Sequence, residues 1–483
     1  MSSTETNNRS QRFVGTLKLY TISNIGTRLL SFMLVPIYTF FLHSPAELGY
    51  FDLCYSIVLM LTPLVTLQLR DGIVRFLLPT TDEDKDRRCD VITLVVKLLS
   101  SSFFLWLIIS CIFYFTYGQV RYFFESLMFL FALDAFEIYA QIIRGLGHNR
   151  IFAWNAVAAT FLILVFTVIF LVVLKMGVRG IFLSNILARL IPMILIDAKL
   201  KIFSQYFHFN VSVKRIGREM LRFTLPIIPT AICWYFLDFA GRYFVKYFWG
   251  LEFNGLMAVS SRFSSVIYMM SAIFGQAWQE TAILQYNKNG SEQFFSRIFS
   301  AYLLALSFVL VMYVFVVKSI YPFVVSGNYQ SSWHYLFLMG VSACLSALAS
   351  FFDLGYQCAK KTDKNVKPVL VAVVITCILY CVLIKQFNVY GLIVSNLICF
   401  LFLIIYRYKD THEYFPINIP KFIILPVFFA LASFLPFYFV ETWWISLLCM
   451  MLALSLMAIS IPHSERNMVI DWAKENVLKK FIH

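Results

Sequence analysis

Residues 22–42, ISNIGTRLLSFMLVPIYTFFL, decide the fold class, because they form an apolar stretch long enough to cross a bilayer and carry a single charge, Arg28. A helix needs about 20 apolar residues to span ~30 Å of hydrocarbon. A cation at the bilayer centre costs ~2.5 kcal/mol or more, so it usually faces a bundle interior or a water-filled path. The stretch therefore predicts a membrane protein whose interior attracts an anion.

Apolar runs of similar length recur along the rest of the chain. Of the 483 residues, 60% are hydrophobic and 14% are charged, and the mean hydropathy of +0.76 excludes an ordinary soluble domain. We predict an all-α polytopic membrane protein with about fourteen transmembrane helices. The predicted spans are 14–42, 47–69, 91–116, 122–143, 151–174, 177–198, 219–247, 252–284, 294–318, 332–358, 367–386, 389–408, 420–440 and 443–461.

Lysine and arginine concentrate in alternating loops, as expected when positive charge stays in the cytoplasm. The polar start, MSSTETNNRSQR, lacks the cleavage site of a signal peptide. We predict an even number of spans with both termini in the cytoplasm. The net charge of +14 is explained by this topology and by anionic lipid of the inner leaflet, so nucleic-acid binding is not expected. The predicted outer loops hold only Arg121, Lys175, Arg179, Lys246, Lys318 and Lys385.

An internal repeat is visible when the chain is shifted by 206 residues, which lays 46–51 (AELGYF) over 252–257 (EFNGLM) and matches Gly49 with Gly255. Proline interrupts the span before each glycine, Pro36 in the first case and Pro226 with Pro229 in the second. The pair Pro226 and Pro229 is either a bending point or an ordinary feature of a membrane helix. Parallel repeats with a binding site between the halves are a recurrent transporter plan. The predicted organisation is a cytoplasmic tail (1–13), a six-helix bundle (14–198), a cytoplasmic linker (199–218), a second six-helix bundle (219–408), an extra helix pair (409–461) and a cytoplasmic tail (462–483).

Arginines inside the predicted spans are the candidate substrate-binding cations. Arg242 either binds substrate or forms an ion pair with Asp238, one helical turn earlier. Arg189 either binds substrate or reaches the inner headgroups, because long cationic side chains near a helix end snorkel. The interior candidates are Arg28, Arg262, Arg242 and Arg189, and two further cations at the inner mouth of the second span are Arg70 and Arg75.

Acidic residues inside the spans form a second candidate set. Asp134 and Glu137 are three residues apart and share a helical face, so one of them could carry a proton or a sodium ion during a transport cycle. The alternative is that the acids neutralise neighbouring arginines within the bundle. The candidates for ion coupling are Asp134, Glu137, Asp52, Asp238 and Asp353.

No catalytic or metal-binding motif accompanies these charges. The ten cysteines show no CxxC spacing and the seven histidines form no cluster, so neither a metal site nor a disulfide framework is predicted. The sequence also lacks G-x-S-x-G, HExxH and a Gly-rich phosphate loop with lysine. We therefore predict no cofactor and no catalytic residue.

Four segments resemble one family when their order and spacing are taken together. They are NIGTRLLSFMLVPIYTFFL (24–42), AELGYFDLCYSIVLMLTPLVTLQLRDGIVRFL (46–77), RGLGHNR (144–150) and LRFTLPIIPTAI (221–232). The chain resembles bacterial lipid-linked oligosaccharide flippases of the polysaccharide transporter family, the O-antigen type. This family belongs to the superfamily that also holds multidrug exporters and the peptidoglycan-precursor flippase.

The resemblance implies two six-helix bundles around a central cationic cavity. It also implies a flippase that moves an undecaprenyl-pyrophosphate-linked repeat unit across the bacterial inner membrane by alternating access. Arg28 and Arg262 match positions where relatives place cavity arginines. The implied partners are the lipid-linked oligosaccharide, membrane lipid, a polysaccharide polymerase and a chain-length regulator.

Two other functions remain open at this point. A multidrug or small-cation antiporter of the same fold would need an acidic rather than a cationic cavity, and four interior arginines argue against it. A polysaccharide polymerase or ligase would bring a large outer loop with catalytic residues. The longest outer segment here, 318–331 (KSIYPFVVSGNYQS), has no acid and no histidine, which favours a transporter over an enzyme.

Overall fold

A computed structural model describes residues 26–460, except for residues 28, 43, 78–83, 119–120, 210–213, 287–290, 360 and 441. Both predicted tails and Arg28 lie outside the described residues. The described part is helical and contains no β-strand. After a first helix at Leu29–Phe41, the elements are α2 (Pro45–Val65), α3 (Leu69–Leu77), α4 (Lys85–Tyr117), α5 (Phe123–Gly145), α6 (Asn149–Thr167), η1 (Val168–Val173), α7 (Val178–Leu200), α8 (Ile202–Tyr206), α9 (Lys214–Thr224), α10 (Ile227–Phe239), α11 (Gly241–Trp249), α12 (Leu251–Gln285), α13 (Ser291–Val324), η2 (Gly327–Tyr335), α14 (Leu336–Cys358), η3 (Thr362–Asn365), α15 (Val366–Leu379), η4 (Tyr380–Ile384), α16 (Lys385–Thr411), η5 (Lys421–Ile423), α17 (Ile424–Ala432), α18 (Phe434–Phe439) and α19 (Trp443–Ser460).

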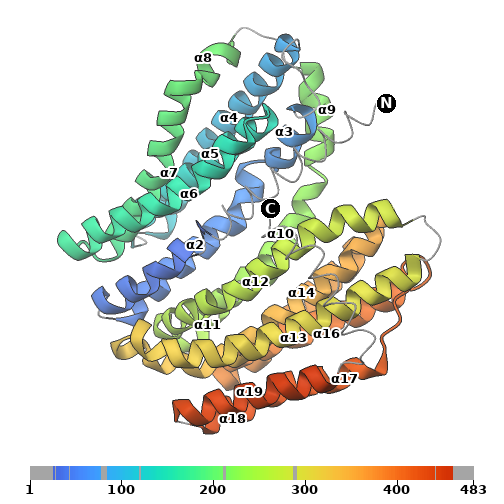
Figure 1. The fold of residues 1–483 in the computed structure, drawn as a ribbon. Helices are drawn as coiled ribbons and strands as arrows, with labels where there is room; N and C mark the ends of the chain where they lie inside the picture. Colours follow the sequence, from blue (N-terminus) through green and yellow to red (C-terminus); the bar gives the residue numbers. More distant parts are fainter. Residues whose placement is uncertain are drawn as a thin grey trace, which may run out of the picture. The chain divides into compact units, whose positions relative to one another are not determined.

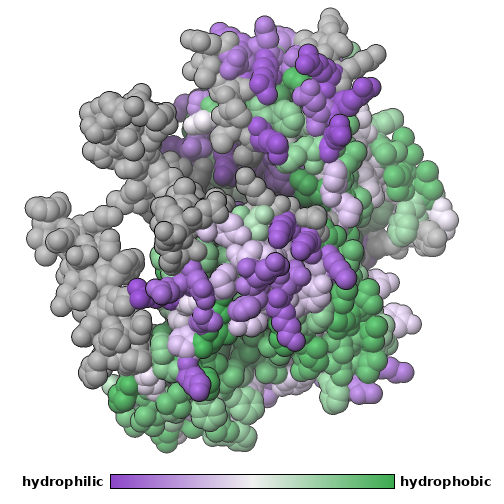
Figure 2. All heavy atoms as spheres, turned by 90° about the vertical axis from the view of Figure 1, so that its right-hand side faces the viewer, coloured by the Kyte–Doolittle hydropathy of each residue, from purple (hydrophilic) through white to green (hydrophobic). Residues whose placement is uncertain are grey.

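Eleven helical segments of the described chain are long and apolar enough to cross a membrane, and two shorter apolar helices, Leu29–Phe41 and Trp444–Ser460, accompany them. One of the eleven, Val366–Thr411, covers two predicted spans and has non-helical backbone at Phe387 and Asn388. Large hydrophobic side chains remain exposed along these helices, as on α4. In the face shown in Figure 2, hydrophobic side chains cover broad areas and hydrophilic ones gather in patches. The all-α polytopic fold class is confirmed, while the count of fourteen spans stays a prediction.

The helices divide into two compact units. The first contains the chain up to Val259 together with Val325–Tyr329 and Cys377–Leu392. The second contains Ser260–Val324, Gln330–Thr376 and the chain from Ile393 onward. These limits differ from the predicted bundle limits, because α10, α11 and the start of α12 lie in the first unit. In the first unit, α5, α6 and α7 lie side by side (Figure 1).

The two glycines matched by the repeat face each other in the first unit. A Cβ atom built on Gly49 of α2 would lie 2.0 Å from the backbone oxygen of Leu251. One built on Gly255 of α12 would lie 1.9 Å from the backbone oxygen of Pro45. Any larger residue would clash with backbone at either position, so the two helix starts can approach this closely only because both residues are glycine.

A second pair of repeated segments is visible once the helices are known. Residues 178–190 (VRGIFLSNILARL) begin α7, and residues 389–401 (VYGLIVSNLICFL) lie within α16. Each segment follows a π-helix, η1 in the first case and η4 in the second. The residue before each segment has the same unusual backbone, with φ 58° and ψ −139° at Gly177 and φ 48° and ψ −131° at Asn388. The sixth and twelfth predicted spans therefore begin in the same way.

Two predicted spans are interrupted in the structure. The second ends at Val65, and the turn at Leu67 and Gln68, both with positive φ, starts the separate helix α3. The seventh is divided into α9, α10 and α11, with the first break at Leu225 and Pro226. Proline has no backbone N–H and disfavours helix in the residue before it, which explains that break.

The predicted extra helix pair forms a hairpin in the second unit. Helices α17 and α19 pack on each other and on α13. Lys318 of α13 donates hydrogen bonds to the backbone oxygens of Pro436 (3.0 Å) and Phe437 (2.5 Å) of α18. The carbonyls at the end of this short helix therefore bind a cation, as helix C-termini generally favour.

Candidate functional site

Four predicted site residues come together in the first unit, and we call Arg70, Asp134, Glu137 and Arg189 the polar cluster. Arg70 is placed by the turn at Leu67 and Gln68, which begins α3. Asp134 and Glu137 lie on α5, and Arg189 lies on α7. Helices α3 and α7 both pack against α5, so residues that are far apart in the sequence reach the same helix.

Asp134 lies in the middle of α5 and its side chain is 0% exposed. The hydroxyl of Thr62 on α2 donates a hydrogen bond of 2.8 Å to Oδ1. The other carboxyl oxygen, Oδ2, is buried and has no hydrogen-bond partner among the described residues. A buried carboxylate with an unpartnered oxygen is costly, because desolvation of the charge is not offset.

Glu137 and Arg70 form a loose ion pair near Asp134. Arg70 Nη1 lies 3.7 Å from Glu137 Oε2, and the two side chains are 54% and 39% exposed. A pair this exposed contributes only about 0–1 kcal/mol to stability. Both groups can therefore separate at small cost and interact with another charged group.

Arg189 lies in the middle of α7. Its Nη1 donates hydrogen bonds to the backbone oxygen of Asn185 (2.8 Å) and to Asn185 Oδ1 (3.0 Å). The guanidinium also lies 5.2 Å from the centre of the Phe129 ring. No carboxylate of the described chain forms a salt bridge with it. The side chain is half-buried, and both of these hydrogen bonds come from Nη1, on one side of the guanidinium.

Arg242 has a different environment, because it forms a close ion pair with Asp52. Arg242 Nε on α11 lies 2.5 Å from Asp52 Oδ2 on α2, and the side chains are only 13% and 15% exposed. Arg242 is thus ion-paired to a residue of another helix, while its role in substrate binding stays a prediction. The side chain of Asp238, the partner considered from the sequence, lies outside the described side chains.

A second buried ion pair lies in the second unit and includes Arg407, which the alternation of basic loops along the sequence places with Lys409 and Lys421 in a predicted cytoplasmic loop. Arg407 near the end of α16 is 0% exposed, and its Nη2 lies 3.2 Å from Asp353 Oδ1 on α14. The guanidinium also donates to the backbone oxygen of Ala349 (2.7 Å) and to Asn365 Oδ1 (2.9 Å). Asn365 Nδ2 donates to the same oxygen of Asp353. Asp353 is therefore neutralised, as the alternative reading of the acids expected.

The remaining candidate arginines of the described chain are Arg75 and Arg262. Arg75 is exposed on α3, with its guanidinium 4.4 Å from the centre of the Phe223 ring. Arg262 is half-buried on α12, in the second unit. Within the described chain, no group of three metal-ligating side chains is close enough to hold a metal ion.

The polar cluster can act on charge in two ways. Arg189 offers guanidinium N–H groups to an anion, and Arg70 can turn to one, since its pairing is loose. Asp134 offers a buried oxygen to a proton or a small cation. The arginines of the Arg242–Asp52 and Arg407–Asp353 pairs are instead each bound to a carboxylate of another helix, which is the geometry of a structural link between helices.

A sequence profile of a known family decides the family of this chain. The family is described as polysaccharide biosynthesis protein, and its profile matches residues 17–279, more than half of the chain. The chain belongs to this family. The predicted membership of the polysaccharide transporter family is thereby confirmed, and no curated protein sequence gives a significant match.

Solved structures with the same fold extend the comparison beyond the profile. The lipid II flippase MurJ, in an inward closed conformation, gives a TM-score of 0.71 at 14% identity, with 93% of this chain and 99% of that chain covered. A multidrug transporter of the MATE family, in an inward-facing conformation, gives a TM-score of 0.54 at 14% identity, with 82% of this chain and 95% of that chain covered. A MATE transporter of Vibrio cholerae gives a TM-score of 0.52 at 12% identity, with 85% of this chain and 98% of that chain covered.

This member of the polysaccharide biosynthesis protein family therefore has the fold of flippases and multidrug transporters. The family and the fold are those expected from the prediction of a membrane transporter rather than an enzyme. Identities this low establish the fold alone. The fold is shared by lipid flippases and drug exporters, so the substrate has to be argued from the side chains of this chain.

Proposed function

We propose that this protein is a flippase for an undecaprenyl-pyrophosphate-linked oligosaccharide, which it moves across the bacterial inner membrane by alternating access. The oligosaccharide would be the repeat unit of O-antigen or of another surface polysaccharide. Membership of the polysaccharide biosynthesis protein family supports a role in that process. A fold shared with a lipid II flippase supports a lipid-linked substrate.

The open guanidinium of Arg189 is the observation that carries this proposal. An arginine kept in a membrane span for structural reasons should be closed by a carboxylate, as Arg242 and Arg407 are. Arg189 instead bonds only to neutral groups of the described chain. A guanidinium edge forms two parallel charge-assisted hydrogen bonds with a pyrophosphate, which an ammonium group cannot reproduce. Arg70 would offer a second, weaker contact.

Asp134 gives the proposed transporter a group for ion coupling. Its Oδ2 atom has no hydrogen-bond donor within the described chain, so binding a proton or a sodium ion there would offset the cost of burial. Thr62 would hold the carboxyl in place in both states. We propose that loading and unloading of this carboxyl drives the return of the empty carrier, with no other cofactor.

The positions of the charged residues support the proposed topology. Lysine and arginine of the alternating loops favour both termini in the cytoplasm. The polymerase and the chain-length regulator of the same polysaccharide would then act on the substrate after it reaches the outer face. Arg189 would meet the pyrophosphate about midway through the membrane.

The proposal is tested by translocation in vesicles. The full-length protein is reconstituted with a fluorescent undecaprenyl-pyrophosphate oligosaccharide, and the share accessible in each leaflet is followed over time. Arg189→Ala should slow translocation at least about tenfold, since hydrogen bonds to charged groups contribute ~1.5–3 kcal/mol. Arg189→Lys should restore it in part.

Arg179→Ala is the matched control, because Arg179 also lies on α7 but is 66% exposed at the helix start and is paired with Glu125. It should translocate at the wild-type rate. A wild-type protein that leaves the lipid in place and instead exports an organic cation, with dependence on Asp134, would overturn the proposal in favour of the exporter alternative.

A further inference from the structure

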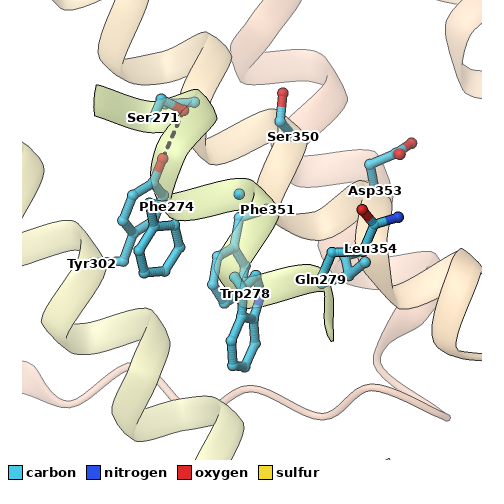
Figure 3. Close-up of a pocket in the computed structure, with 11 residues that line it drawn as sticks. Ser271, Phe274, Trp278, Gln279, Tyr302, Ser350, Phe351, Asp353 and Leu354 are labelled. Carbon is cyan, nitrogen blue, oxygen red and sulfur yellow. Dashed lines mark hydrogen bonds between the residues drawn. The ribbon is translucent and has the colours of Figure 1, made fainter. Parts of the chain in front are cut away.

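The second unit contains a pocket that none of the roles above uses. Its volume is about 220 Å³, and its walls come from α12, α13 and α14 (Figure 3). We call it the aromatic pocket. Its side chains are of two kinds, the rings of Phe274, Trp278, Tyr302 and Phe351 and the polar groups of Ser271, Gln279, Ser350 and Asp353.

The rings are nearly parallel and stack on one another. Phe274 and Tyr302 stack with their centres 3.9 Å apart and their planes 9° apart. Trp278 and Phe351 stack at 5.2 Å and 12°. The two stacks are also close to parallel, since the ring planes of Phe274 and Phe351 are 18° apart. Rings locked against each other form a rigid wall that loses little conformational freedom when a ligand stacks on it.

The polar groups lie to one side of these rings. In Figure 3, Ser350, Asp353 and Gln279 lie along one edge of the pocket, and the hydroxyl of Ser271 is bonded to that of Tyr302 at 2.8 Å. The indole Nε1 of Trp278 is buried and has no partner among the described residues. Such an orphaned donor costs free energy unless a ligand or water accepts its hydrogen.

The charge of the pocket excludes two ligand classes. No lysine or arginine is among the described residues that line it, so it is not built for a pyrophosphate. Its one acid, Asp353, is held by the buried guanidinium of Arg407 at 3.2 Å. An acid already neutralised attracts an organic cation weakly, whereas it still accepts hydrogen bonds from hydroxyl groups.

The size and position of the pocket narrow the ligand further. A volume of 220 Å³ is below the roughly 300–1,000 Å³ of pockets for drug-sized ligands, so one ring fits better than an oligosaccharide. Tyr302 lies near the start of α13, and Trp278 and Asp353 lie near the ends of α12 and α14. The predicted topology places these helix ends on the cytoplasmic side, where a substrate would enter.

We propose that the aromatic pocket binds one uncharged sugar ring of the transported oligosaccharide, an inference that rests on the flippase function proposed above. The apolar face of a pyranose stacks on the wall of rings, and its hydroxyls bond to Gln279, Ser350 and Asp353. The indole of Trp278 donates to a hydroxyl or ring oxygen. The pocket then selects the sugar.

Binding is measured first, on the full-length protein in nanodiscs, with the methyl glycosides of glucose, galactose and N-acetylglucosamine. The test variant is Phe274→Leu, and Phe294→Leu is its control. Both rings contact Trp278, with centres 6.4 and 6.0 Å away, but only Phe274 lines the pocket. Saturation-transfer NMR should show that the wild type binds at least one glycoside. Phe274→Leu should bind it about tenfold more weakly, as loss of a stacking ring predicts. Phe294→Leu should bind it as tightly as the wild type does.

Three binding results would overturn the inference. The first is no glycoside bound by the wild type, the second is equal binding by the two leucine variants, and the third is displacement of the glycoside by tetraphenylphosphonium at lower concentration. Gln279→Ala gives a second arm that leaves the rings intact. It should weaken sugar binding without changing the fluorescence of the unliganded protein.

Translocation separates this inference from the function on which it rests. Phe274→Leu should slow the flipping of the sugar-bearing lipid but not that of undecaprenyl pyrophosphate alone. If the wild type flips both lipids and Phe274→Leu matches Phe294→Leu, the pocket has no role and the flippase function stands. If the wild type flips neither lipid but binds glycosides through Phe274, the flippase function fails and the sugar site stands.

Discussion

Helices α5 and α7 of the first half are repeated as α14 and α16 in the second half. The repeated helices share sequence segments but differ in their charged residues. Residues 136–141 (FEIYAQ) of α5 correspond to 352–357 (FDLGYQ) of α14, and residues 178–190 of α7 correspond to 389–401 of α16. The acids Glu137 and Asp353 therefore occupy one position of the repeat. Glu137 pairs loosely with an exposed arginine, whereas Asp353 is closed by a buried one.

The other charged positions differ more strongly. Asp134 of α5 corresponds to Ser350 of α14, and Arg189 of α7 corresponds to Phe400 of α16. Phe400 is buried, while Arg189 is half-buried with an open edge. The first half thus places open charges where the second has a hydroxyl and a ring. The comparison teaches that one helical frame can be specialised for charge in one half and for an uncharged ligand in the other.

The largest effect is expected from breaking the ion pair between Arg407 and Asp353 in the second half. Arg407→Ala should lower the free energy of unfolding by about 3–5 kcal/mol, because it leaves Asp353 without its buried partner. The measurement is the thermal midpoint of the detergent-solubilised protein. Replacing both residues together, Arg407→Met with Asp353→Leu, should recover most of the loss. A single variant as stable as the wild type would show that the pair is not a structural link.

The next effect is expected from replacing Arg189 of α7 by phenylalanine, the residue at the corresponding position of α16. Arg189→Phe should leave the thermal midpoint nearly unchanged, because the site is only half-buried, and should slow translocation at least about tenfold through loss of charge-assisted hydrogen bonds. Vesicle assays at matched protein levels measure the rate. Translocation at the wild-type rate would mean that the difference between α7 and α16 has no bearing on the substrate.

These positions show how far the sequence could predict the site. Asp134 and Glu137 were found because a spacing of three residues puts two side chains on one helical face. Arg407 was assigned to a loop, because it ends an apolar run and nothing local distinguishes a buried cation there from a cytoplasmic one. The partner of Arg242 is Asp52, on another helix, and helix periodicity carries no information about contacts between helices.

The fold was predicted more completely than the site. Apolar runs locate the helices by length alone, so every predicted span overlaps an apolar helix of the described chain. The breaks were harder to predict. Pro226 indicates the helix break at its own position, but the turn at Leu67 and Gln68 contains no glycine or proline from which a break could be predicted. The repeat at Gly49 and Gly255 was visible, while that of α7 and α16 required the helix starts to be known.

A third effect concerns ion coupling. Asp134→Ser copies Ser350 and removes the buried carboxyl, so translocation should no longer respond to an imposed proton or sodium gradient. Stability should change by no more than about 1 kcal/mol, because the loss of the hydrogen bond from Thr62 is offset by removal of a buried unpartnered oxygen. The assay compares rates with and without each gradient. A variant that still responds would place the coupling ion elsewhere.

The smallest effect tests the matching turns before α7 and α16. Asn388→Gly should raise the free energy of unfolding by about 1 kcal/mol, because a side chain is strained at φ 48° and ψ −131°. Gly177→Asn should lower it by a similar amount. Thermal midpoints of both variants give the signs. Shifts in the same direction would show that the two turns differ in more than their residue type.

The π-helices η1 and η4 add a point about the helices that follow them. A π-helical turn is wider than an α-helical turn, because its hydrogen bonds join residues five apart. The two lie at matching places, each just before a repeated segment and its positive-φ residue. Both halves therefore enter the repeated helix through the same widened turn, and the exchange of Arg189 for Phe400 changes the charge of that helix without changing how it begins.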